Sequence, residues 1–329
     1  MSADAPGKKL FFREAISRAL HEEMARNDQL LLLGQDIGPF GGPYGEFVGL
    51  YERFGAARVR DMPVAEAAMV GMAAGAAAAN IRTLVSITYM DFLMLGLDPL
   101  VNYAAKLSYK TGGQLHAPMV VKTTAGAKGQ GVAHSQCLES WLMSVPGLTV
   151  VAPACAADAY GLMKTALSAP GPVVFVDHKR LFPTAGLVPD AETAVPFGSA
   201  KVAREGGDVT LVSHSYMVGQ CLAAATLLQG EGISCEVIDL RSLAPLDLPT
   251  VCASVRKTGA LLTVEEGQLT CGVGAEVAFR IRDQVDVRAV ARVGAAPSPV
   301  SSSPLLEAAS LPDRHRIAAV VVALLRPAR

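Results

Sequence analysis

The chain has 329 residues, a formal net charge of −1, 51% hydrophobic residues and 18% charged residues. Its length suits two domains of about 150 residues each. The near-neutral charge and the few aromatic residues argue against a protein that binds nucleic acid or an anionic membrane.

Targeting and redox signals are absent from the sequence. No apolar stretch reaches the length of a transmembrane helix, and the first residues lack the pattern of a signal peptide. The six cysteines include no Cys-x-x-Cys pair, which argues against a zinc site and against a disulfide scaffold. We therefore expect a cytoplasmic protein with reduced thiols.

The first half of the chain alternates short apolar strands with helical segments. We expect strands at 30–33, 59–61, 84–89, 119–123, 148–152 and 173–177, and helices at 11–26, 67–79, 91–109, 136–143 and 156–168. This alternation is typical of a doubly wound α/β domain around a parallel sheet. We place that domain at residues 1–185.

A second α/β domain is expected at residues 200–329. Residues 183–198 contain three prolines and little periodicity, which indicates a linker at 186–199. Beyond it we expect strands at 209–213, 234–239, 261–265 and 287–293, and helices at 218–228, 249–256, 273–282 and 315–325.

Glu66 stands at the start of a helix that has no polar side chain from Ala67 to Ala79. A helix that is apolar on all sides is expected to be buried, and an unpaired buried charge costs several kcal/mol. Glu66 therefore needs a binding partner or a proton. The alternative is an ordinary first-turn carboxylate that faces the positive end of the helix.

Glycine-rich stretches lie at 34–47, 124–134 and 272–274. None of them has the order of a P-loop or of a dinucleotide-binding fingerprint, and the sequence has no Gly-x-Ser-x-Gly nucleophile motif. His134 ends the second stretch, after a strand, where α/β domains often place catalytic groups. A neighbour of a helix N-cap is the alternative interpretation of His134.

Several of these segments carry a family likeness. RVRDMPVAEAAMVGMAAGAA, YMDFLMLGLDPLVNYAAK, GVAHSQCLESWLMSVPGLTVVAP and DHKRLF occur in this order. Together they resemble the beta subunit of the first, decarboxylating component of 2-oxo acid dehydrogenase complexes, of the pyruvate, branched-chain and acetoin types. That family belongs to the transketolase-like thiamine diphosphate superfamily. The resemblance implies a pyrimidine-binding domain followed by a transketolase C-terminal-like domain.

The resemblance also implies roles for three residues. Glu66 would hydrogen-bond a ring nitrogen of the aminopyrimidine of thiamine diphosphate, and Phe92 would stack on the same ring. His134 would lie near the substrate or its acyl adduct, with a role in proton transfer or in acylation of a lipoyl group. The implied reaction is oxidative decarboxylation of a 2-oxo acid with acyl transfer to a lipoyl domain.

One superfamily motif is missing. The superfamily binds Mg²⁺ and the diphosphate through Gly-Asp-Gly with an Asn further along, whereas the nearest stretch here is Gly207-Asp208-Val209. The resemblance therefore implies an alpha subunit that carries this motif and the Mg²⁺, in an α2β2 heterotetramer. The second domain would serve dimer contacts and docking to the dihydrolipoamide acyltransferase core.

The sequence also departs from the family pattern. Gln35 and Ser86 stand where many members have an acid, so proton transfer between sites would depend on Asp91 and Glu66. Ala169 replaces an acid of the potassium loop of some relatives, and we expect no metal on this chain. Two alternatives stay open: half of a split transketolase-type enzyme, and a non-catalytic scaffold subunit.

Overall fold

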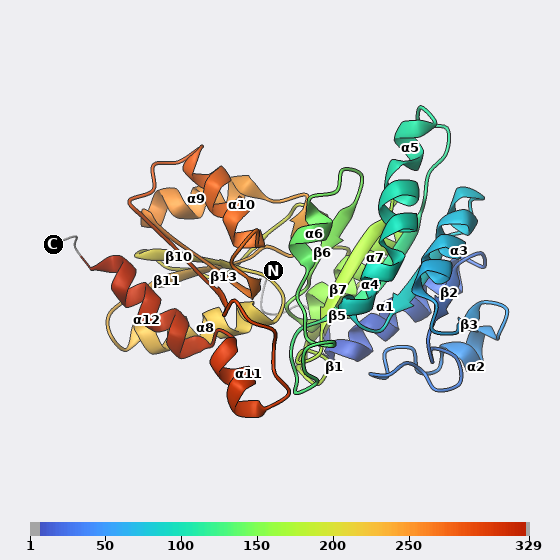
Figure 1. The fold of residues 1–329 in the computed structure, drawn as a ribbon, viewed down its shortest axis with the longest axis horizontal. Helices are drawn as coiled ribbons and strands as arrows, with labels where there is room; N and C mark the ends of the chain where they lie inside the picture. The colour runs from blue at the N-terminus through green and yellow to red at the C-terminus, as the bar shows by residue number, and fades with distance from the viewer. Residues whose placement is uncertain (1–6, 327–329) are drawn as a thin grey trace. The chain divides into compact units, whose positions relative to one another are not determined.

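The computed structural model describes residues 7–326. They form two compact units: unit 1 comprises residues 7–125 and 141–197, and unit 2 comprises residues 126–140 and 198–326. Both units are α/β, which confirms the expected fold class (Figure 1). The loop at 126–140 groups with unit 2, although the sequence placed it in the first domain.

Unit 1 is built on a parallel sheet with the strand order β6-β7-β5-β4-β2-β3. Its strands are β2 (Leu31–Gly34), β3 (Val59–Asp61), β4 (Thr83–Ile87), β5 (Met119–Ala125), β6 (Thr149–Val151) and β7 (Val173–His178). Every residue of β4, β5 and β7 is buried, as expected where helices cover both faces of a parallel sheet.

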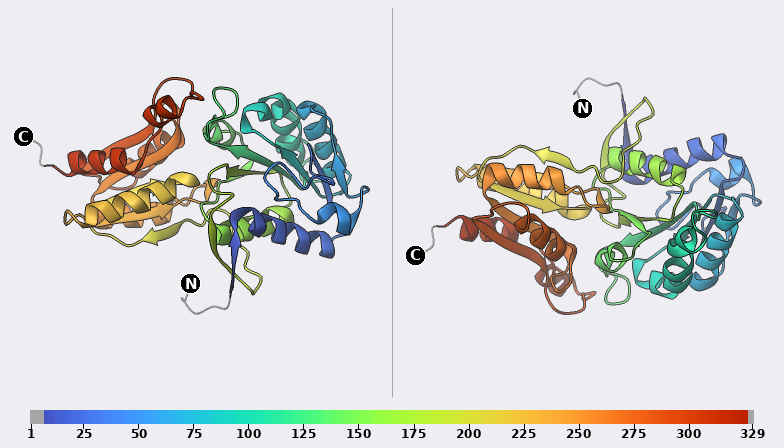
Figure 2. Two further views of the ribbon diagram at one scale, coloured as in Figure 1. Left: turned by 90° about the horizontal axis from the view of Figure 1, so that it is seen from below. Right: turned by 90° about the horizontal axis from the view of Figure 1, so that it is seen from above.

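Helices cover both faces of this sheet (Figure 2). On one face lie α1 (Phe12–Arg26) and α7 (Ala156–Ser168), which pack on each other. On the other lie α3 (Glu66–Ala78) and the helical segments of residues 90–110. Short helices α2 (Leu50–Phe54) and α6 (Glu139–Met143) complete this part of the chain.

The helix α3 is only partly buried. Met69, Val70 and Ala73 lie on the buried face, whereas Ala68 and Met72 are exposed. The prediction that this apolar helix is buried on all sides is therefore wrong for the single chain. An apolar exposed helix face is a feature of surfaces that meet another chain.

The expected long helix at 91–109 is broken into short pieces. They are α4 (Met90–Leu93), a 3-10 turn (Met94–Gly96), a π-helical segment (Asp98–Tyr103), a second 3-10 turn (Ala104–Lys106) and α5 (Leu107–Lys110). Pro99 lies in the first turn of the π-helical segment, and proline has no N–H for a regular helix. Gly96 lies against Val70 of α3 with no room for a Cβ.

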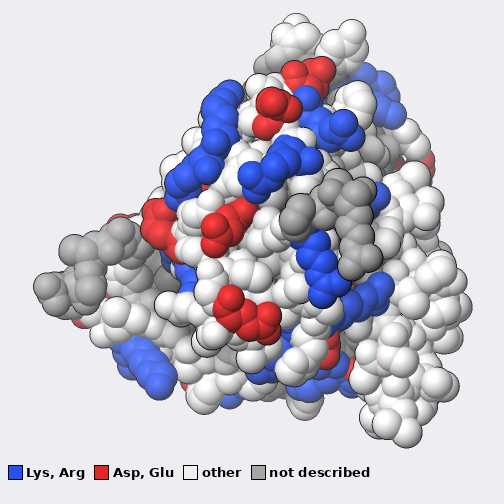
Figure 3. Space-filling view, turned by 90° about the vertical axis from the view of Figure 1, so that its left-hand side faces the viewer, with Lys and Arg blue, Asp and Glu red and all other residues white. Residues whose placement is uncertain are grey.

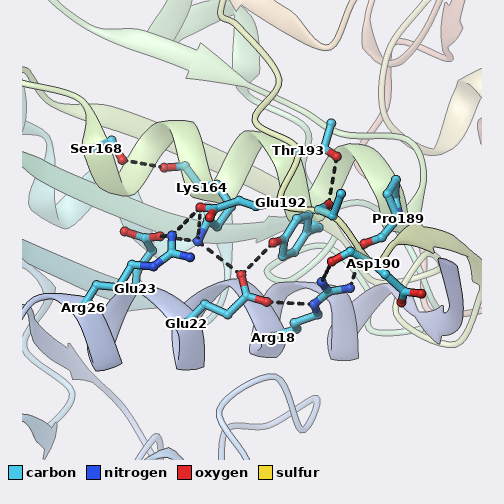
Figure 4. Close-up of polar contacts among 12 residues, drawn as sticks. Arg18, Glu22, Glu23, Arg26, Lys164, Ser168, Pro189, Asp190, Glu192 and Thr193 are labelled. Atoms are coloured by element: carbon cyan, nitrogen blue, oxygen red, sulfur yellow. Dashed lines mark hydrogen bonds and ion pairs between the residues drawn. The ribbon is translucent and has the colours of Figure 1, made fainter. Parts of the chain in front are cut away.

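The expected linker at 186–199 is mostly part of unit 1. It contains most of β8 (Ala185–Pro189), which pairs antiparallel with β1 (Gly7–Phe11). The same segment supplies Glu192, which shares the Lys164 ammonium of α7 with Glu22 and Glu23 of α1 (Figure 4). A periodicity analysis misses β1 and β8 because their pairing joins segments far apart in the sequence.

Unit 2 has the sheet order β14-β13-β10-β11-β9, in which β9 is antiparallel to β11 and the other described pairs are parallel. Its strands are β9 (Lys201–Arg204), β10 (Val209–Ser213), β11 (Cys235–Asp239), β13 (Ala260–Gln268) and β14 (Ala289–Ala295), with a short strand β12 (Ser242–Ala244). Figure 1 shows α9 (Leu248–Thr258) and α10 (Val273–Arg282) on one face, and α8 (Tyr216–Gln229) and α12 (Arg314–Leu325) on the other. The helix α11 (Pro304–Ser310) was not expected.

Candidate active site

Three polar side chains meet where β2, β3 and β4 end. Gln35 follows β2, Glu66 opens α3 after β3, and Thr88 follows β4. Gln35 Nε2 donates a hydrogen bond to Glu66 Oε1 at 3.2 Å, and Thr88 Oγ1 donates one to Gln35 Oε1 at 3.5 Å. The carboxyl ends of parallel strands are where open α/β sheets bind ligands.

Glu66 is a buried carboxylate, with 4% of its surface exposed, in the first turn of α3. The Gln35 amide supplies the partner that the sequence analysis required. One carboxylate offers about four lone-pair sites, so Glu66 keeps acceptor capacity for a ligand. The positive end of α3 also favours a negative charge at this position.

Phe92 lies in α4, four residues after Thr88, in the same unit as Glu66. Its ring is half-buried and meets the Tyr89 ring edge-on, with centroids 6.2 Å apart and an interplanar angle of 73°. Asp91, beside it, is 4% exposed. The segment after β4 thus carries an aromatic ring and a buried acid at the edge where Glu66 lies.

The first glycine-rich loop, residues 35–49, runs from β2 to α2. Its near end is held by Gln35 and by Gly38 N, which donates to Asp61 Oδ1 at 2.7 Å. A Cβ at residue 38 would lie 2.6 Å from Asp61 Oδ2. Gly42 has φ +87, a conformation that favours glycine.

The far end of this loop reaches a buried lysine. Lys122 Nζ of β5 lies 2.9 Å from Glu46 Oε1 of the loop and 2.7 Å from Asp177 Oδ2 of β7. Burial alone would lower the pKa of Lys122, but the charges of Asp177 and Glu46 raise it above its usual value. Burial raises the pKa of Asp177 although Lys122 is adjacent. We call Lys122, Glu46 and Asp177 the buried triad.

Aromatic rings surround the buried triad. The Lys122 ammonium lies 5.6 Å from the Phe47 ring centroid and 5.5 Å from that of Phe182. Tyr44 of the loop stacks on Phe182, with centroids 4.4 Å apart and an interplanar angle of 17°. Burial raises the pKa of Tyr44, and the neighbouring Tyr89 phenol raises it further. The Tyr44 phenol of the loop therefore lies near the Tyr89 phenol of the segment that carries Phe92.

His134 belongs to unit 2, in the loop at 126–140. Its ring is half-buried, and the backbone N–H of His134 donates to Gly131 O at 3.2 Å. Glu66 and Phe92 belong to unit 1. The helix expected at 136–143 begins only at Glu139, so His134 lies in an irregular loop and is not a helix-capping neighbour.

A cavity of 340 Å³ lies next to His134 within unit 2. Ser135 lines it, is 2% exposed, and its Oγ has no hydrogen-bond partner within the described residues. The remaining lining includes Cys137, Glu266, Gln268 and prolines of the loop after β14. A buried hydroxyl without a partner is a group that a ligand or water satisfies.

A buried acid begins α6, close to this cavity. Burial, together with the charges of Glu266 and Glu265, raises the pKa of Glu139 from 4.5 to about 7. Glu265 itself accepts hydrogen bonds from the N–H groups of Val273 and Gly274 at the start of α10. The sequence analysis missed Glu139, although it directly follows the His-Ser-Gln-Cys-Leu segment.

The buried triad was also missed. One signal was present: Lys122 is a charged residue inside an apolar strand, and such a residue needs a buried partner. Its partners are 76 and 55 residues away in the sequence, so only tertiary structure identifies them. Lys179, one of two adjacent basic residues, is 1% exposed and lies 5.0 Å from the Tyr89 ring centroid.

One face of the molecule carries charges of both signs. On the face shown in Figure 3, Lys and Arg side chains alternate with Asp and Glu side chains, and neither sign forms a separate field. Among residues 7–326, no helix combines the length and the apolar character needed to cross a membrane.

Two family models match the chain. Residues 8–184 match the pyrimidine-binding domain of transketolase, and residues 198–317 match the transketolase C-terminal domain. The chain is 43% identical over 285 residues to pyruvate dehydrogenase E1 component subunit beta-2, mitochondrial, of Oryza sativa subsp. japonica, covering 85% of this chain and 76% of that protein.

A bacterial relative and a solved structure show the same likeness. The pyruvate dehydrogenase E1 component subunit beta of Rickettsia felis is 43% identical over 267 residues, covering 81% of this chain and 82% of that protein. A structure described as a split gene transketolase, inactive beta4 tetramer, superposes with a TM-score of 0.80 at 25% identity, covering 97% of this chain and 99% of that one.

Proposed function

The chain belongs to the family of pyruvate dehydrogenase E1 component beta subunits, and on this basis we propose that it is the beta subunit of a thiamine diphosphate-dependent 2-oxo acid dehydrogenase. The reaction is oxidative decarboxylation of a 2-oxo acid, with transfer of the acyl group to a lipoyl domain. One observation supports this assignment above the others: Glu66 is buried at the carboxyl edge of the sheet, with Gln35 bonded to one of its oxygens.

The residues of unit 1 fit the pyrimidine half of the cofactor. Glu66 is an acceptor carboxylate with unused lone pairs, and Phe92 is a half-buried ring in the same unit. When bound, thiamine diphosphate supplies the electron sink for decarboxylation. Glu66 Oε2 is the atom at which we place the exchangeable proton, because Oε1 already accepts from Gln35.

His134 is the proton-transfer residue that we assign to unit 2. An imidazole changes charge near neutral pH, and a half-buried ring in an irregular loop combines access with a partly desolvated environment. Within this proposal, His134 acts on the substrate or on the acyl group as it passes to the acceptor.

The diphosphate half of the cofactor and its Mg²⁺ are assigned to an alpha subunit that carries Gly-Asp-Gly. In this chain, Asp208 of the nearest stretch is used locally: Asp208 Oδ2 accepts from Ser234 N at 2.6 Å. The exposed apolar face of α3, which includes Ala68 and Met72, supports a subunit contact. We therefore propose an α2β2 assembly that docks on an acyltransferase core.

A split transketolase is the second candidate, and the likeness to a split gene transketolase favours it. A sugar-phosphate substrate needs accessible cations near the site, whereas Lys179 is 1% exposed. A scaffold role for this chain predicts a stable assembly that shows no thiamine diphosphate-dependent turnover of a substrate.

The test begins with affinity purification of the tagged chain from its host. The proposal expects a stoichiometric partner that carries Gly-Asp-Gly, and thiamine diphosphate-dependent CO₂ release from one member of a panel of 2-oxo acids. A homo-oligomer that binds no such partner would contradict it, and sugar-phosphate turnover would favour the split transketolase.

Glu66→Gln is the decisive variant. It keeps the shape of the side chain but removes the exchangeable proton, so decarboxylation should fall by about 100-fold or more with assembly unchanged. Glu276→Gln is the matched control, because Glu276 lies in the first turn of α10 with 53% of its side chain exposed. Equal turnover in the two variants would refute the role of Glu66.

A further inference from the structure

The loop at 35–49 crosses the carboxyl edge of the sheet of unit 1. It starts at β2 and reaches Lys122 of β5 and Asp177 of β7 through Glu46. The strand order places β4 between β2 and β5, so the loop passes the end of β4, where the Tyr89–Phe92 segment emerges. The loop is therefore held on both sides of the segment that carries Phe92.

The far attachment is almost completely withdrawn from water. Lys122, Glu46 and Asp177 have side chains that are 1%, 2% and 0% exposed. The attraction between buried charges is screened far less than that between exposed charges. Removal of the lysine would leave two buried carboxylates without a cation, which is a costly arrangement.

Two routes lead from this attachment to the candidate site. Along the loop, its backbone leads from Glu46 back to Gln35, whose amide bonds Glu66 at 3.2 Å. Across the loop, Tyr44 stacks on Phe182 beside Lys122 and adjoins Tyr89. The Tyr89 ring contacts the Phe92 ring edge-on, at 6.2 Å between centroids.

We propose that Lys122 is a positioning residue for the pyrimidine site: with Glu46 and Asp177 it fixes the loop at 35–49, and thereby the Gln35 amide on Glu66 and Tyr44 beside the Phe92 segment. This inference rests on the proposed function. It goes beyond that function because Lys122 lies on β5 and acts only through Gln35 and Tyr44.

The experiment compares two buried lysines in the assembled protein. The variants are Lys122→Met and Lys122→Arg, with Lys164→Met as the matched control. Lys164 is also buried, at 3% exposure, and also bonds several carboxylates of unit 1. The carboxylates that pair with Lys164 belong to Glu22 and Glu23 of α1 and to Glu192, all outside the loop at 35–49. Hydrogen exchange of residues 35–49 and the Kd for thiamine diphosphate are measured for each variant.

Lys122→Met should increase exchange across residues 35–49 about tenfold or more and raise the Kd about tenfold. Lys122→Arg should keep both the exchange of residues 35–49 and the Kd close to their wild-type values, because arginine retains the positive charge. Lys164→Met should change neither. If Lys122→Met and Lys164→Met give the same exchange and the same Kd, the inference is wrong.

Two further arms keep the result interpretable. Should Lys122→Met fail to fold, Glu46→Gln serves instead: it leaves the Lys122–Asp177 pair and detaches only the loop, with the same direction of change expected. Failure of the wild-type assembly to bind thiamine diphosphate would refute the proposed function. The exchange data would still test whether Lys122 fixes the loop.

Discussion

Unit 1 contains two buried lysines that hold carboxylates in different ways. Lys122 joins one loop residue, Glu46, to one strand residue, Asp177, and all three side chains are at most 2% exposed. Each member of this triad has few partners and almost no exposed surface. The loss of one member therefore leaves charges that nothing else neutralises.

Lys164 is almost equally buried, but its partners are not. Its ammonium meets the carboxylates of Glu22, Glu23 and Glu192, which are 28%, 15% and 44% exposed (Figure 4). Arg18 and Arg26 bond the same carboxylates from the solvent side. Burial alone would lower the pKa of Lys164, but these carboxylates raise it.

From this difference we infer that the exposure of the partner carboxylates, more than the burial of the lysine, determines how much stability is lost when the lysine is replaced. In the network around Lys164, arginines and water replace a lost bond. Around the buried triad, the ion pairs seen among residues 7–326 include no second cation that could take the place of Lys122. The network therefore packs α1 against α7, while the triad fixes one loop in one position.

The largest expected effect is that of Lys122→Met on stability. It should lower the free energy of unfolding by about 3–5 kcal/mol, because Glu46 and Asp177 stay buried without their cation. Urea unfolding at pH 7 measures this, and the double variant Lys122→Met/Glu46→Gln should recover part of the loss. A loss below about 1 kcal/mol would show that water reaches the triad.

Glu139 extends the comparison to a buried acid of unit 2 whose charged neighbours include Glu265 and Glu266. Its folded pKa of about 7 exceeds the usual 4.5, so folding favours the protonated form, and stability falls as the pH rises through that window. Glu139→Gln should remove this dependence and stabilise the chain at pH 8 by up to about 3 kcal/mol.

Unfolding curves from pH 4 to pH 8 test this prediction. The wild-type free energy of unfolding should decrease with pH more steeply than that of Glu139→Gln, and the two should converge near pH 4.5. Parallel curves would mean that Glu139 titrates as an exposed glutamate.

A smaller effect is expected for Lys164→Met, about 1–2 kcal/mol, since Arg18 and Arg26 still bond its carboxylates. Urea unfolding beside Lys122→Met gives the direct comparison. A loss as large as that of Lys122→Met would show that partner exposure does not explain the difference.

The smallest effect is that of Glu192→Gln, below about 1 kcal/mol at pH 7. Hydrogen bonds from Arg26 and Lys164 lower the pKa of Glu192 to about 2, so its contribution is present above pH 4.5 and is lost as the pH falls toward 2. Added salt should reduce it further. Thermal unfolding at 0.05 M and 1 M NaCl tests this, and an effect that grows with salt would contradict it.

Local patterns predicted much of unit 1 and part of its site. The apolar runs became β2, β4, β5 and β7, and Glu66 does begin a helix. Its need for a partner followed from burial and charge alone, and the structure supplies Gln35. The sequence could not predict the breaks at 90–110, because apolar helical periodicity continues through Gly96 and Pro99.

By itself, the sequence determined the two α/β units and the position of Glu66 at a helix start, because alternating apolar runs and helix signals act over a few residues. Only the tertiary structure decided that Glu46, Lys122 and Asp177 meet, that the loop at 126–140 groups with unit 2, and that Glu139 is buried among acids. The physical reason is range: burial and charge pairing join residues far apart in the chain, and strand order, which local pattern does not encode, brings them together.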